Sequence, residues 1–326
     1  MDPRLAALGL RSPVVLAPMA GITDLPFRDI VQDFGAGLVV SEMVASREMV
    51  QAKRSVRDRA ELGANVAGTA VQIAGRDPHW MAEAARVVEG QGARIIDINM
   101  GCPAKKVTGG LSGSALLRDH DHALRLIEAV VGAVSVPVTL KTRLGWDDES
   151  RNTVDLAIRA EAAGIAMLTI HGRTRCQFYK GCADWVAIGQ IVRAVSVPVL
   201  ANGDVLDAES ARIALQQSGA AGVMVGRGVQ GAPWRLAEIA AGLGHGRAPN
   251  VPSGGALAKL VRRHLDANLA FYGEELGARV IRKHLGWYMD HAGTDAETRR
   301  AILTGRPQTV RARLQDAFDQ PVACAA

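Results

Sequence analysis

Eight short runs of β-branched and aliphatic residues recur at fairly even intervals between Val14 and Gly226, and most are separated by stretches with helical periodicity. A strand, a helix and a second strand in succession form a right-handed parallel unit. Eight such units predict a (β/α)8 TIM barrel, because an open doubly wound sheet usually has fewer strands. The predicted strands are Val14–Pro18, Leu38–Met43, Ala70–Gly75, Ile95–Met100, Val136–Arg143, Met167–Gly172, Val197–Gly203 and Gly222–Gly226.

An internal repeat and the composition support this architecture. The hexapeptide AVSVPV occurs at Ala133–Val138 and again at Ala194–Val199, and in both places it joins a predicted helix to a predicted strand. The chain of 326 residues is 48% hydrophobic, which excludes a disordered chain. Its 35 glycines and 4% aromatic residues favour an α/β fold over a β-sandwich.

A second region follows the predicted barrel. Residues 241–255 are rich in Gly, Pro and Ser and predict a linker, whereas the rest of the chain has helical periodicity without strand-like runs. We therefore expect a barrel at 1–243, a linker at 244–255 and a small all-helical domain at 256–326. Eleven basic and eight acidic side chains in the last region carry three of the net charge of +5. That charge permits a polyanionic partner without requiring one.

Cysteine usage and the apolar pattern predict the compartment. Four cysteines without a C-x-x-C pair form neither a disulfide framework nor a zinc motif, so no metal site is expected. The first ten residues lack the basic and apolar regions of a signal peptide. No apolar run reaches the roughly 18 residues of a membrane-spanning helix. The sequence predicts a soluble, cytoplasmic protein that has no membrane partner.

Polar residues and glycines follow the predicted strands, at the end of the barrel where TIM barrels carry their active sites. Each one alone could be an ordinary loop residue, but the whole set predicts a site. The last two groups place glycines and a cation where barrels commonly bind phosphate, because glycine lets backbone N–H groups approach an anion. The set is Pro18–Gly21, Glu42, Gln72, Asn99, Cys102, Lys141, Arg143, His171, Arg173, Asn202–Asp204 and Gly226–Gly228.

Lys141, His171 and Cys102 are the candidates for chemistry within this set. Lys141 follows an apolar strand and is expected to be a Schiff-base nucleophile or a fixed cation, unless it is a surface lysine. His171 is placed to hydrogen-bond a ligand, although a lone histidine is commonly a core residue. Cys102 is an inert buried thiol, a nucleophile or a general acid, since a thiol of ordinary pKa is mostly protonated at neutral pH.

Nine motifs lie in order along the predicted barrel: LAPMAGITDLPFR (Leu16–Arg28), SEM (Ser41–Met43), QIAG (Gln72–Gly75), DINMGCPAKKV (Asp97–Val107), GSALLRD (Gly113–Asp119), LKTRLGW (Leu140–Trp146), TIHGRTR (Thr169–Arg175), ANGD (Ala201–Asp204) and VGRG (Val225–Gly228). Together with RKHLGWY (Arg282–Tyr288), they resemble the tRNA-dihydrouridine synthases, most closely the B-type bacterial subgroup. The segment DINMGCP is highly specific. The resemblance implies an enzyme that uses FMN, reduced by NADPH, to reduce the C5–C6 bond of selected uridines in the tRNA D-loop.

The resemblance also implies roles for individual residues. In the implied reaction, hydride passes from flavin N5 to uracil C6 and the Cys102 thiol protonates C5, while Lys141 stabilises the reduced flavin. Asn99, at the same strand exit as Cys102, would contact the base or the flavin. The uridine would be flipped out of the folded tRNA to react. FMN contacts are implied for Pro18, Met19, Ala20, Gln72, Lys141, His171, Asn202, Gly203, Asp204, Gly226 and Arg227, of which the last five would hold the phosphate end.

Two groups of basic residues are candidates for tRNA contacts. Arg279, Arg282 and Lys283 lie in the helical region beside aromatic residues that could stack on bases or pack in a core. The simpler alternative for this group is a solvated helix face. The candidates on the barrel are Lys105, Lys106, Arg173 and Arg175. No DNA partner is expected.

Two other functions fit part of the pattern. One is a different FMN-dependent barrel oxidoreductase that acts on a free pyrimidine or a similar small molecule, which leaves the charged helical region unexplained. The other is an RNA-binding or regulatory protein built on an inactive barrel, which would bind no flavin. A flavin absorbance band, together with a comparison of the rates at which tRNA and free uracil are reduced, distinguishes these two functions from that of a tRNA-dihydrouridine synthase.

Overall fold

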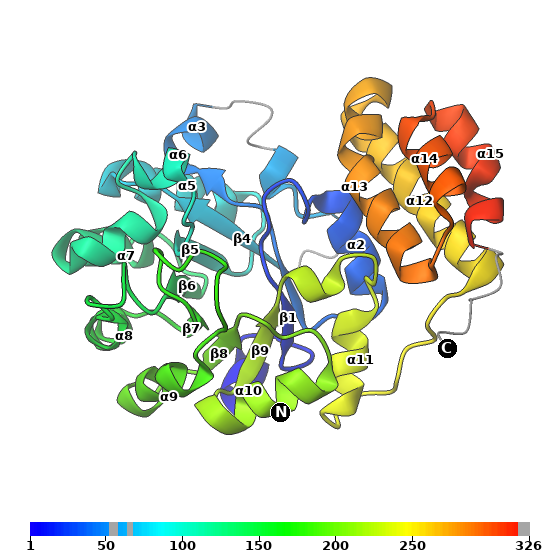
Figure 1. The fold of residues 1–326 in the computed structure, drawn as a ribbon. Coiled ribbons are helices and arrows are strands. Elements are labelled where there is room, and N and C mark those ends of the chain that lie inside the picture. The colour runs from blue at the N-terminus through cyan, green and yellow to red at the C-terminus, as the bar shows by residue number, and fades with distance from the viewer. Residues whose placement is uncertain (52–57, 64–67, 319–326) are drawn as a thin grey trace.

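The computed structural model describes residues 1–51, 58–63 and 68–318, and its centre is a closed barrel of parallel strands (Figure 1). Strand β1 (Val14–Leu16) pairs with both β2 (Leu38–Val40) and β9 (Gly222–Val225), and β2 pairs with β4 (Thr69–Ala74), which closes the sheet. The order then follows the chain through β5 (Ile96–Met100), β6 (Val138–Arg143), β7 (Met167–His171) and β8 (Val199–Asn202). The predicted (β/α)8 barrel is confirmed.

The second predicted strand, Leu38–Met43, is interrupted in the structure. β2 ends at Val40, and the chain resumes as the two-residue strand β3 (Val44–Ala45), which pairs with the C-terminal end of β4. The break lets Ser41 Oγ accept a hydrogen bond from the backbone N–H of Gln72 at 3.0 Å. It also lets the Glu42 carboxylate accept one from the backbone N–H of Gly21 at the barrel mouth. β2 and β3 therefore share one position in the barrel.

Helices cover the outside of the barrel. Most of them begin at an aspartate, because its carboxylate accepts the free backbone N–H groups of the first turn; Asp24, Asp77 and Asp207 do so for α2, α5 and α10. The covering helices are α2 (Leu25–Asp33), α5 (Pro78–Gly90), α7 (His120–Val131), α8 (Thr153–Ala162), α9 (Trp185–Ala194), α10 (Ala208–Ser218) and α11 (Arg235–Gly242). Shorter segments are α1 (Pro3–Ala7), α3 (Ser46–Val50), α6 (Lys105–Thr108), and the 3-10 helices η2 (Gly113–Arg118) and η3 (Arg227–Val229).

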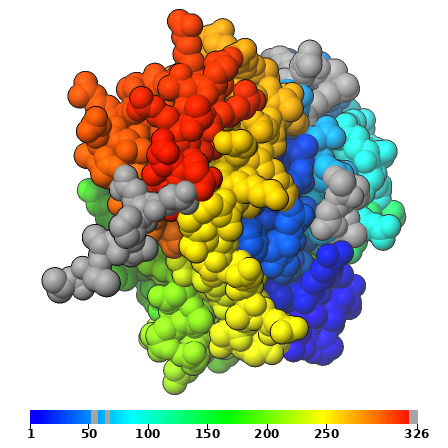
Figure 2. All heavy atoms as spheres, turned by 90° about the vertical axis from the view of Figure 1, so that its right-hand side faces the viewer, coloured from blue at the N-terminus to red at the C-terminus, as the bar shows by residue number. Residues whose placement is uncertain are grey.

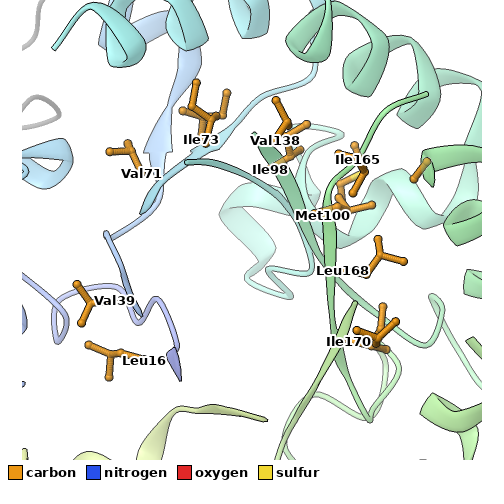
Figure 3. Close-up of a cluster of buried hydrophobic side chains, with 14 of the residues drawn as sticks. Leu16, Val39, Val71, Ile73, Ile98, Met100, Val138, Ile165, Leu168 and Ile170 are labelled. Atoms are coloured by element: carbon orange, nitrogen blue, oxygen red, sulfur yellow. The ribbon is translucent and has the colours of Figure 1, made fainter. Parts of the chain in front are cut away.

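The strands divide their side chains between two apolar clusters because successive residues point to opposite faces of a sheet. One set, which includes Ile73, Ile98 and Leu168, belongs to the large core that extends from the sheet to the covering helices (Figure 3). The other set belongs to a smaller cluster that we call the lower interior. It consists of Leu5, Leu10, Val15, Ala17, Leu38, Val40, Ala70, Ile95, Met167, Leu200 and Met224.

Four described helices follow the barrel and form the C-terminal region: α12 (Gly254–Tyr272), α13 (Glu274–Ala292), α14 (Ala296–Thr304) and α15 (Pro307–Phe318). Their apolar faces form a core of their own together with Trp234. Phe27 of α2 joins the region to the barrel, since its ring lies 5.7 Å from that of His264 and 4.9 Å from that of His284. Figure 2 shows these helices, in yellow to red, packed along the blue N-terminal part of the barrel.

The predicted linker and the predicted end of the helical domain can be compared with the described structure. Residues 243–253, between α11 and α12, form neither helix nor strand. Residues 319–326, the end of the predicted domain, lie outside the described part of the chain. Within the described part, no helix is both long enough and apolar enough to span a membrane.

Candidate active site

A pocket of about 450 Å³ opens at the C-terminal ends of the strands. This volume lies within the usual range of small-molecule and cofactor sites, about 300–1,000 Å³. Every residue for which the sequence predicts a cofactor contact lines it, and so do Asn99 and Cys102. The predicted residues on its wall are Pro18, Met19, Ala20, Gln72, Asn99, Cys102, Lys141, Arg143, His171, Asn202, Gly203, Asp204, Gly226, Arg227 and Gly228.

A network of buried polar groups holds the Cys102 side of the pocket. Asp97 accepts hydrogen bonds from Thr139 Oγ1 at 2.6 Å and from Gln72 Nε2 at 2.7 Å. Gln72 Oε1 accepts from Asn99 Nδ2 at 2.8 Å, and Asn99 Oδ1 accepts from the backbone N–H of Cys102 at 2.9 Å. The amide of Asn99, predicted to contact substrate, is therefore engaged by its neighbours.

Asp97 is a member of the site that the sequence-based reasoning did not single out. A signal for it exists, because β5 reads IDINM and all five of its positions are buried, with at most 8% exposure at Asn99. Two polar residues at period two in a wholly buried strand indicate a polar face inside the fold. The residues that pair with Asp97 are on other strands and are not indicated by that pattern.

Lys141 lies beside this network on β6, in register with Asn99. Burial, as the larger cause, and the charge of Arg143 together lower the pKa of Lys141 to about 8, while the charge of Asp97 opposes the change. The amine lines the pocket as a cation at neutral pH, when most of it is still protonated. It is thus placed to face an anionic group of a ligand.

His171 lies at the end of β7 on the wall of the same pocket. Burial lowers the pKa of His171 well below its ordinary value, and the nearby cations Arg143, Lys141, Arg173 and Arg227 act in the same direction. The imidazole is therefore neutral at pH 7. Its Nδ1 is buried and has no hydrogen-bond partner within the described structure, which is uncommon for a buried polar atom.

The ends of β8 and β9 form the opposite side of the pocket. Asn202 Nδ2 donates to the Met224 carbonyl at 2.8 Å and ties the two strands together. Gly203 has a φ of +110°, and a Cβ at that position would lie 3.1 Å from His171 Nε2. Only glycine fits there without displacing the histidine.

Asp204 and two arginines continue this side of the pocket. Arg173 donates to both carboxylate oxygens of Asp204, at 2.9 and 2.6 Å, and Arg227 reaches the same carboxylate at 3.4 Å. Burial alone would raise the pKa of Asp204, but the hydrogen bonds from Arg173 and from the Ala183 N–H outweigh burial and hold the pKa below its ordinary value. The side chain of Arg227 is 54% exposed, so its guanidinium has free donors for an anion.

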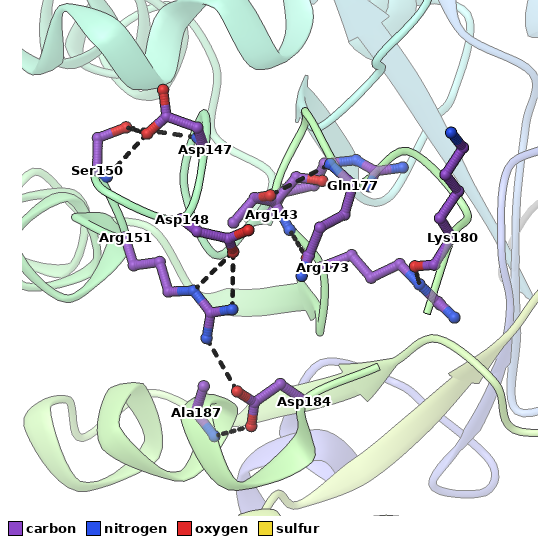
Figure 4. A network of polar contacts seen from close by, with 11 residues as sticks. Arg143, Asp147, Asp148, Ser150, Arg151, Arg173, Gln177, Lys180, Asp184 and Ala187 are labelled. Carbon is purple, nitrogen blue, oxygen red and sulfur yellow. Dashed lines mark hydrogen bonds and ion pairs between the residues drawn. The ribbon is translucent and has the colours of Figure 1, made fainter. Parts of the chain in front are cut away.

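The prediction that Arg173 contacts tRNA phosphates needs correction. The Arg173 side chain is only 2% exposed, and its guanidinium also donates to the carbonyl of Lys180 at 3.0 Å (Figure 4). It donates to the carbonyl of Gly181 at 2.5 Å as well. A guanidinium with all of these partners has no surface left for a phosphate. Arg173 instead fixes Asp204 and the loop that follows β7.

That loop carries two exposed aromatic residues that the sequence-based reasoning left aside. Phe178 and Tyr179 are 46% and 49% exposed and line the pocket. The centre of the Tyr179 ring lies 5.7 Å from the guanidinium carbon of Arg143 and 5.2 Å from that of Arg227. In the sequence these residues are recognisable only as two adjacent aromatic residues in the segment TRCQFYK. Their place at the pocket depends on how the loop folds.

The other predicted tRNA contacts lie outside the pocket. Lys105 and Lys106 are exposed on α6, next to the Cys102 loop, and the Arg175 guanidinium carbon lies 4.7 Å from the centre of the Trp146 ring. On α13, the positions of Arg279, Arg282 and Lys283 are exposed. Lys283 Nζ lies 3.1 Å from the place where a Cβ on Gly21 would be, so α13 brings a cation to the edge of the pocket.

Comparison with known proteins identifies the family. The family model described as "Dihydrouridine synthase (Dus)" matches residues 15–322. A protein of Rhodobacter capsulatus named "Probable tRNA-dihydrouridine synthase" is 62% identical over 318 residues, which cover 97% of this chain and 98% of the relative. A protein of that name from Rhizobium leguminosarum bv. phaseoli is 53% identical over 96% of this chain and 97% of its own, and the "tRNA-dihydrouridine synthase B" of Xanthomonas axonopodis pv. citri is 45% identical over 95% and 94%. The chain belongs to the dihydrouridine synthase family.

Proposed function

We propose that this enzyme reduces the C5–C6 bond of uridines in the D-loop of tRNA, with FMN as its cofactor and NADPH as the reductant. The observation that carries the proposal is that Cys102, Lys141 and neutral His171 face one pocket whose far side is built from Gly203, Gly226 and Arg227. Such a pocket has a proton donor and a cation at one side and an anion site at the other. The family and the names of the relatives support the same substrate.

The pocket residues fit FMN on three grounds. The buried Nδ1 of His171 lacks a partner in the described structure, Lys141 supplies a cation for an electron-rich ring edge, and Arg227 has free donors for a phosphate. Gln72 and Lys141 would hold the ring system, with Pro18, Met19 and Ala20 against it. Asn202, Gly203, Asp204, Gly226 and Arg227 would hold the phosphate end. When bound, FMN supplies hydride transfer.

Cys102 would supply the proton in this reaction. Its thiol lines the pocket and its backbone N–H is held by Asn99. A thiol can donate its proton to the carbon that becomes electron-rich when the pyrimidine is reduced. Lys141 would stabilise negative charge in the pocket, provided that the amine remains protonated.

tRNA would be held by a surface on both sides of the pocket mouth. Arg279, Arg282 and Lys283 of the C-terminal region lie on one side, and Lys105, Lys106 and Arg175 of the barrel lie on the other. His284 and Tyr288 are 1% and 0% exposed, so they pack in the helical core and do not stack on bases. We propose residues 256–326 as the tRNA-binding domain and 1–243 as the catalytic barrel; of the predicted linker 244–255, Gly254 and Gly255 already belong to α12. A tRNA substrate would place the enzyme in the cytoplasm.

The purified protein tests the proposed reaction directly. We expect an absorbance band near 450 nm from bound flavin, and NADPH-dependent formation of dihydrouridine in unmodified tRNA, measured by mass spectrometry of tRNA fragments. Reduction of free uracil as fast as of tRNA would show a small-molecule oxidoreductase instead. A colourless protein that binds tRNA without modifying it would show an RNA-binding protein.

The tRNA surface is tested by reversing two charges on α13. Arg282→Glu with Lys283→Glu should weaken tRNA binding and lower the salt dependence of the dissociation constant by about one unit per lost phosphate contact, while NADPH oxidation is unchanged. Arg11→Glu with Arg94→Glu is the matched control, because both residues are exposed, precede strands β1 and β5, and lie at the other end of the barrel. Equal affinities of the two double variants would remove α13 from the tRNA surface.

A further inference from the structure

The hydrogen-bonded network around Asp97 has a defined direction. Both carboxylate oxygens of Asp97 accept hydrogen bonds, so Gln72 must present its NH2 group to Asp97 and its oxygen to Asn99. Asn99 must then present its NH2 group to Gln72 and its oxygen to the loop that follows β5. Reversing either amide would set donor against donor or acceptor against acceptor. The acceptor at position 97 therefore sets the orientation of both amides.

The end of this network is the backbone of the loop that carries Cys102. Asn99 Oδ1 accepts from the N–H of Gly101 at 3.1 Å and from the N–H of Cys102 at 2.9 Å. A donor at that place in the Asn99 side chain would repel both N–H groups. The position of the Cys102 thiol on the pocket wall thus depends on the Asn99 amide, whose orientation is linked through Gln72 on the neighbouring strand β4 to Asp97 on the same strand β5.

We propose that Asp97 is a positioning residue for Cys102, which acts through Gln72 and Asn99 to hold the N–H side of the Cys102 loop. The proposal gives a role to a buried carboxylate that takes no part in the proposed reaction. It rests on the proposed function only where the thiol is used as a proton donor. The statement that Asp97 holds the Cys102 loop through Gln72 and Asn99 does not depend on that function.

Asp97 controls only one side of the loop. The carbonyl of Cys102 accepts from Ser114 Oγ at 2.9 Å and from the Ser114 N–H at 3.2 Å, and the carbonyl of Gly101 accepts from Arg143 Nε at 2.8 Å. These bonds do not involve Asp97. Loss of the acceptor at position 97 should therefore loosen the loop and leave it attached.

Three variants distinguish the effect of the hydrogen-bond acceptor at position 97 from the effect of its charge. Two of them change Asp97 and the third changes its neighbour Thr139. Asp97→Leu removes the acceptor, whereas Asp97→Asn removes the charge and keeps an oxygen for Gln72. Thr139→Val is the matched control, because it removes the other hydrogen bond to Asp97 and leaves the path to Cys102 intact. Should Asp97→Leu fail to fold, Asp97→Ser replaces it, since a serine hydroxyl is too short to reach Gln72.

The readout is the rate at which iodoacetamide alkylates Cys102 in the holoprotein, followed by peptide mass spectrometry after the flavin content is measured. Cys176 and Cys182 are exposed and free and serve as references within the same molecule. In Asp97→Leu we expect the Cys102 rate to rise about two- to tenfold relative to the references, the factor for one lost hydrogen bond. Asp97→Asn and Thr139→Val should stay within about twofold of the unmodified protein. In the tRNA assay, Asp97→Leu should lower kcat and leave KM for tRNA unchanged.

Two results would overturn the proposal: an unchanged relative Cys102 rate in folded Asp97→Leu, or an Asp97→Asn variant as reactive as Asp97→Leu, which would assign the effect to charge. A failure of the proposed function is distinguishable. In that case the unmodified protein makes no dihydrouridine, while the alkylation rates still follow the acceptor at position 97.

Discussion

The two ends of the barrel interior have opposite chemistry. The lower interior is apolar, and Val15, Leu200 and Met224 within it are at most 1% exposed. The other part, which we call the upper interior, is polar and includes Lys141 on the pocket wall and Asp97, the second residue of β5. Burial of the lower side chains contributes about 25 cal/mol per Å² of apolar surface, whereas burial of the upper ones costs free energy unless every polar group finds a partner.

This difference in chemistry assigns different roles to the two ends of the barrel: the upper interior serves function and the lower interior serves stability. In the upper interior, burial shifts the pKa of Lys141 to about 8 and leaves Nδ1 of His171 without a partner in the described structure. Groups of this kind are common at functional sites, because a ligand can satisfy them. The lower interior has no such groups and supplies stability that the upper interior does not. Substitutions should therefore affect activity at one end and stability at the other.

The largest effect is expected from Cys102→Ala at the pocket wall. Loss of the proposed proton donor should lower the rate of dihydrouridine formation by about 10²- to 10⁴-fold, the usual contribution of general acid catalysis. Bound flavin, its reduction by NADPH and the melting temperature should stay as in the unmodified protein. The rate is measured in single turnover with tRNA, and a rate within a few-fold of the unmodified enzyme would remove the thiol from the reaction.

Leu200→Ala is the counterpart in the lower interior. Leu200 is 0% exposed, so its truncation should cost about 2–5 kcal/mol of unfolding free energy through lost burial and the remaining cavity. Denaturant unfolding measures the loss, and the rate of dihydrouridine formation below the melting temperature should be nearly unchanged. If activity fell as steeply as stability, the two ends of the barrel would not be independent.

The pH dependence of Lys141 sharpens the contrast. Since burial lowers the pKa of Lys141 to about 8, the amine is charged below that pH and loses its proton as the pH rises through it. The rate of flavin reduction by NADPH, measured without tRNA, should fall up to about tenfold per pH unit above pH 8. In Lys141→Arg this alkaline decrease should be absent, because a guanidinium stays charged. A decrease that persists in that variant would belong to another group.

The smallest effect is expected at Thr139, beside Asp97. Thr139→Val removes the hydrogen bond of 2.6 Å from the hydroxyl to Asp97 Oδ1 and should cost about 1 kcal/mol of unfolding free energy. Activity should change little, because Gln72 still binds Asp97. Thermal unfolding and the tRNA assay measure the two quantities. A large loss of activity would extend the functional end of the barrel down to Thr139.

Local patterns predicted the barrel and the set of pocket residues. Strand β6 ends at Arg143 as the apolar run predicts, and residues such as Lys141 reach the pocket because alternate residues of a strand share a face. Such inferences need only neighbouring residues. The interruption between β2 and β3 escaped them, because it depends on Ser41 and Glu42 binding groups elsewhere in the fold.

Pairings between distant segments were beyond the reach of the sequence. Arg173 reads as a surface cation beside Arg175, yet it is buried against Asp204, 31 residues further on. Asp97 binds Thr139 and Gln72, which are 42 and 25 residues away. Side chains at such distances meet only when neighbouring strands set their register.

The sequence by itself determined the alternating strands and helices, the polar strand ends and the family motifs, because each is written in short stretches of chain. The tertiary structure decided which of the polar groups are free. It paired Arg173 with Asp204 and Asp97 with Gln72, whereas it left Arg227 more than half exposed and Nδ1 of His171 buried without a partner among the described residues. The physical reason is that a charge in this barrel acquires its role from the partners and the burial that the closed sheet gives it.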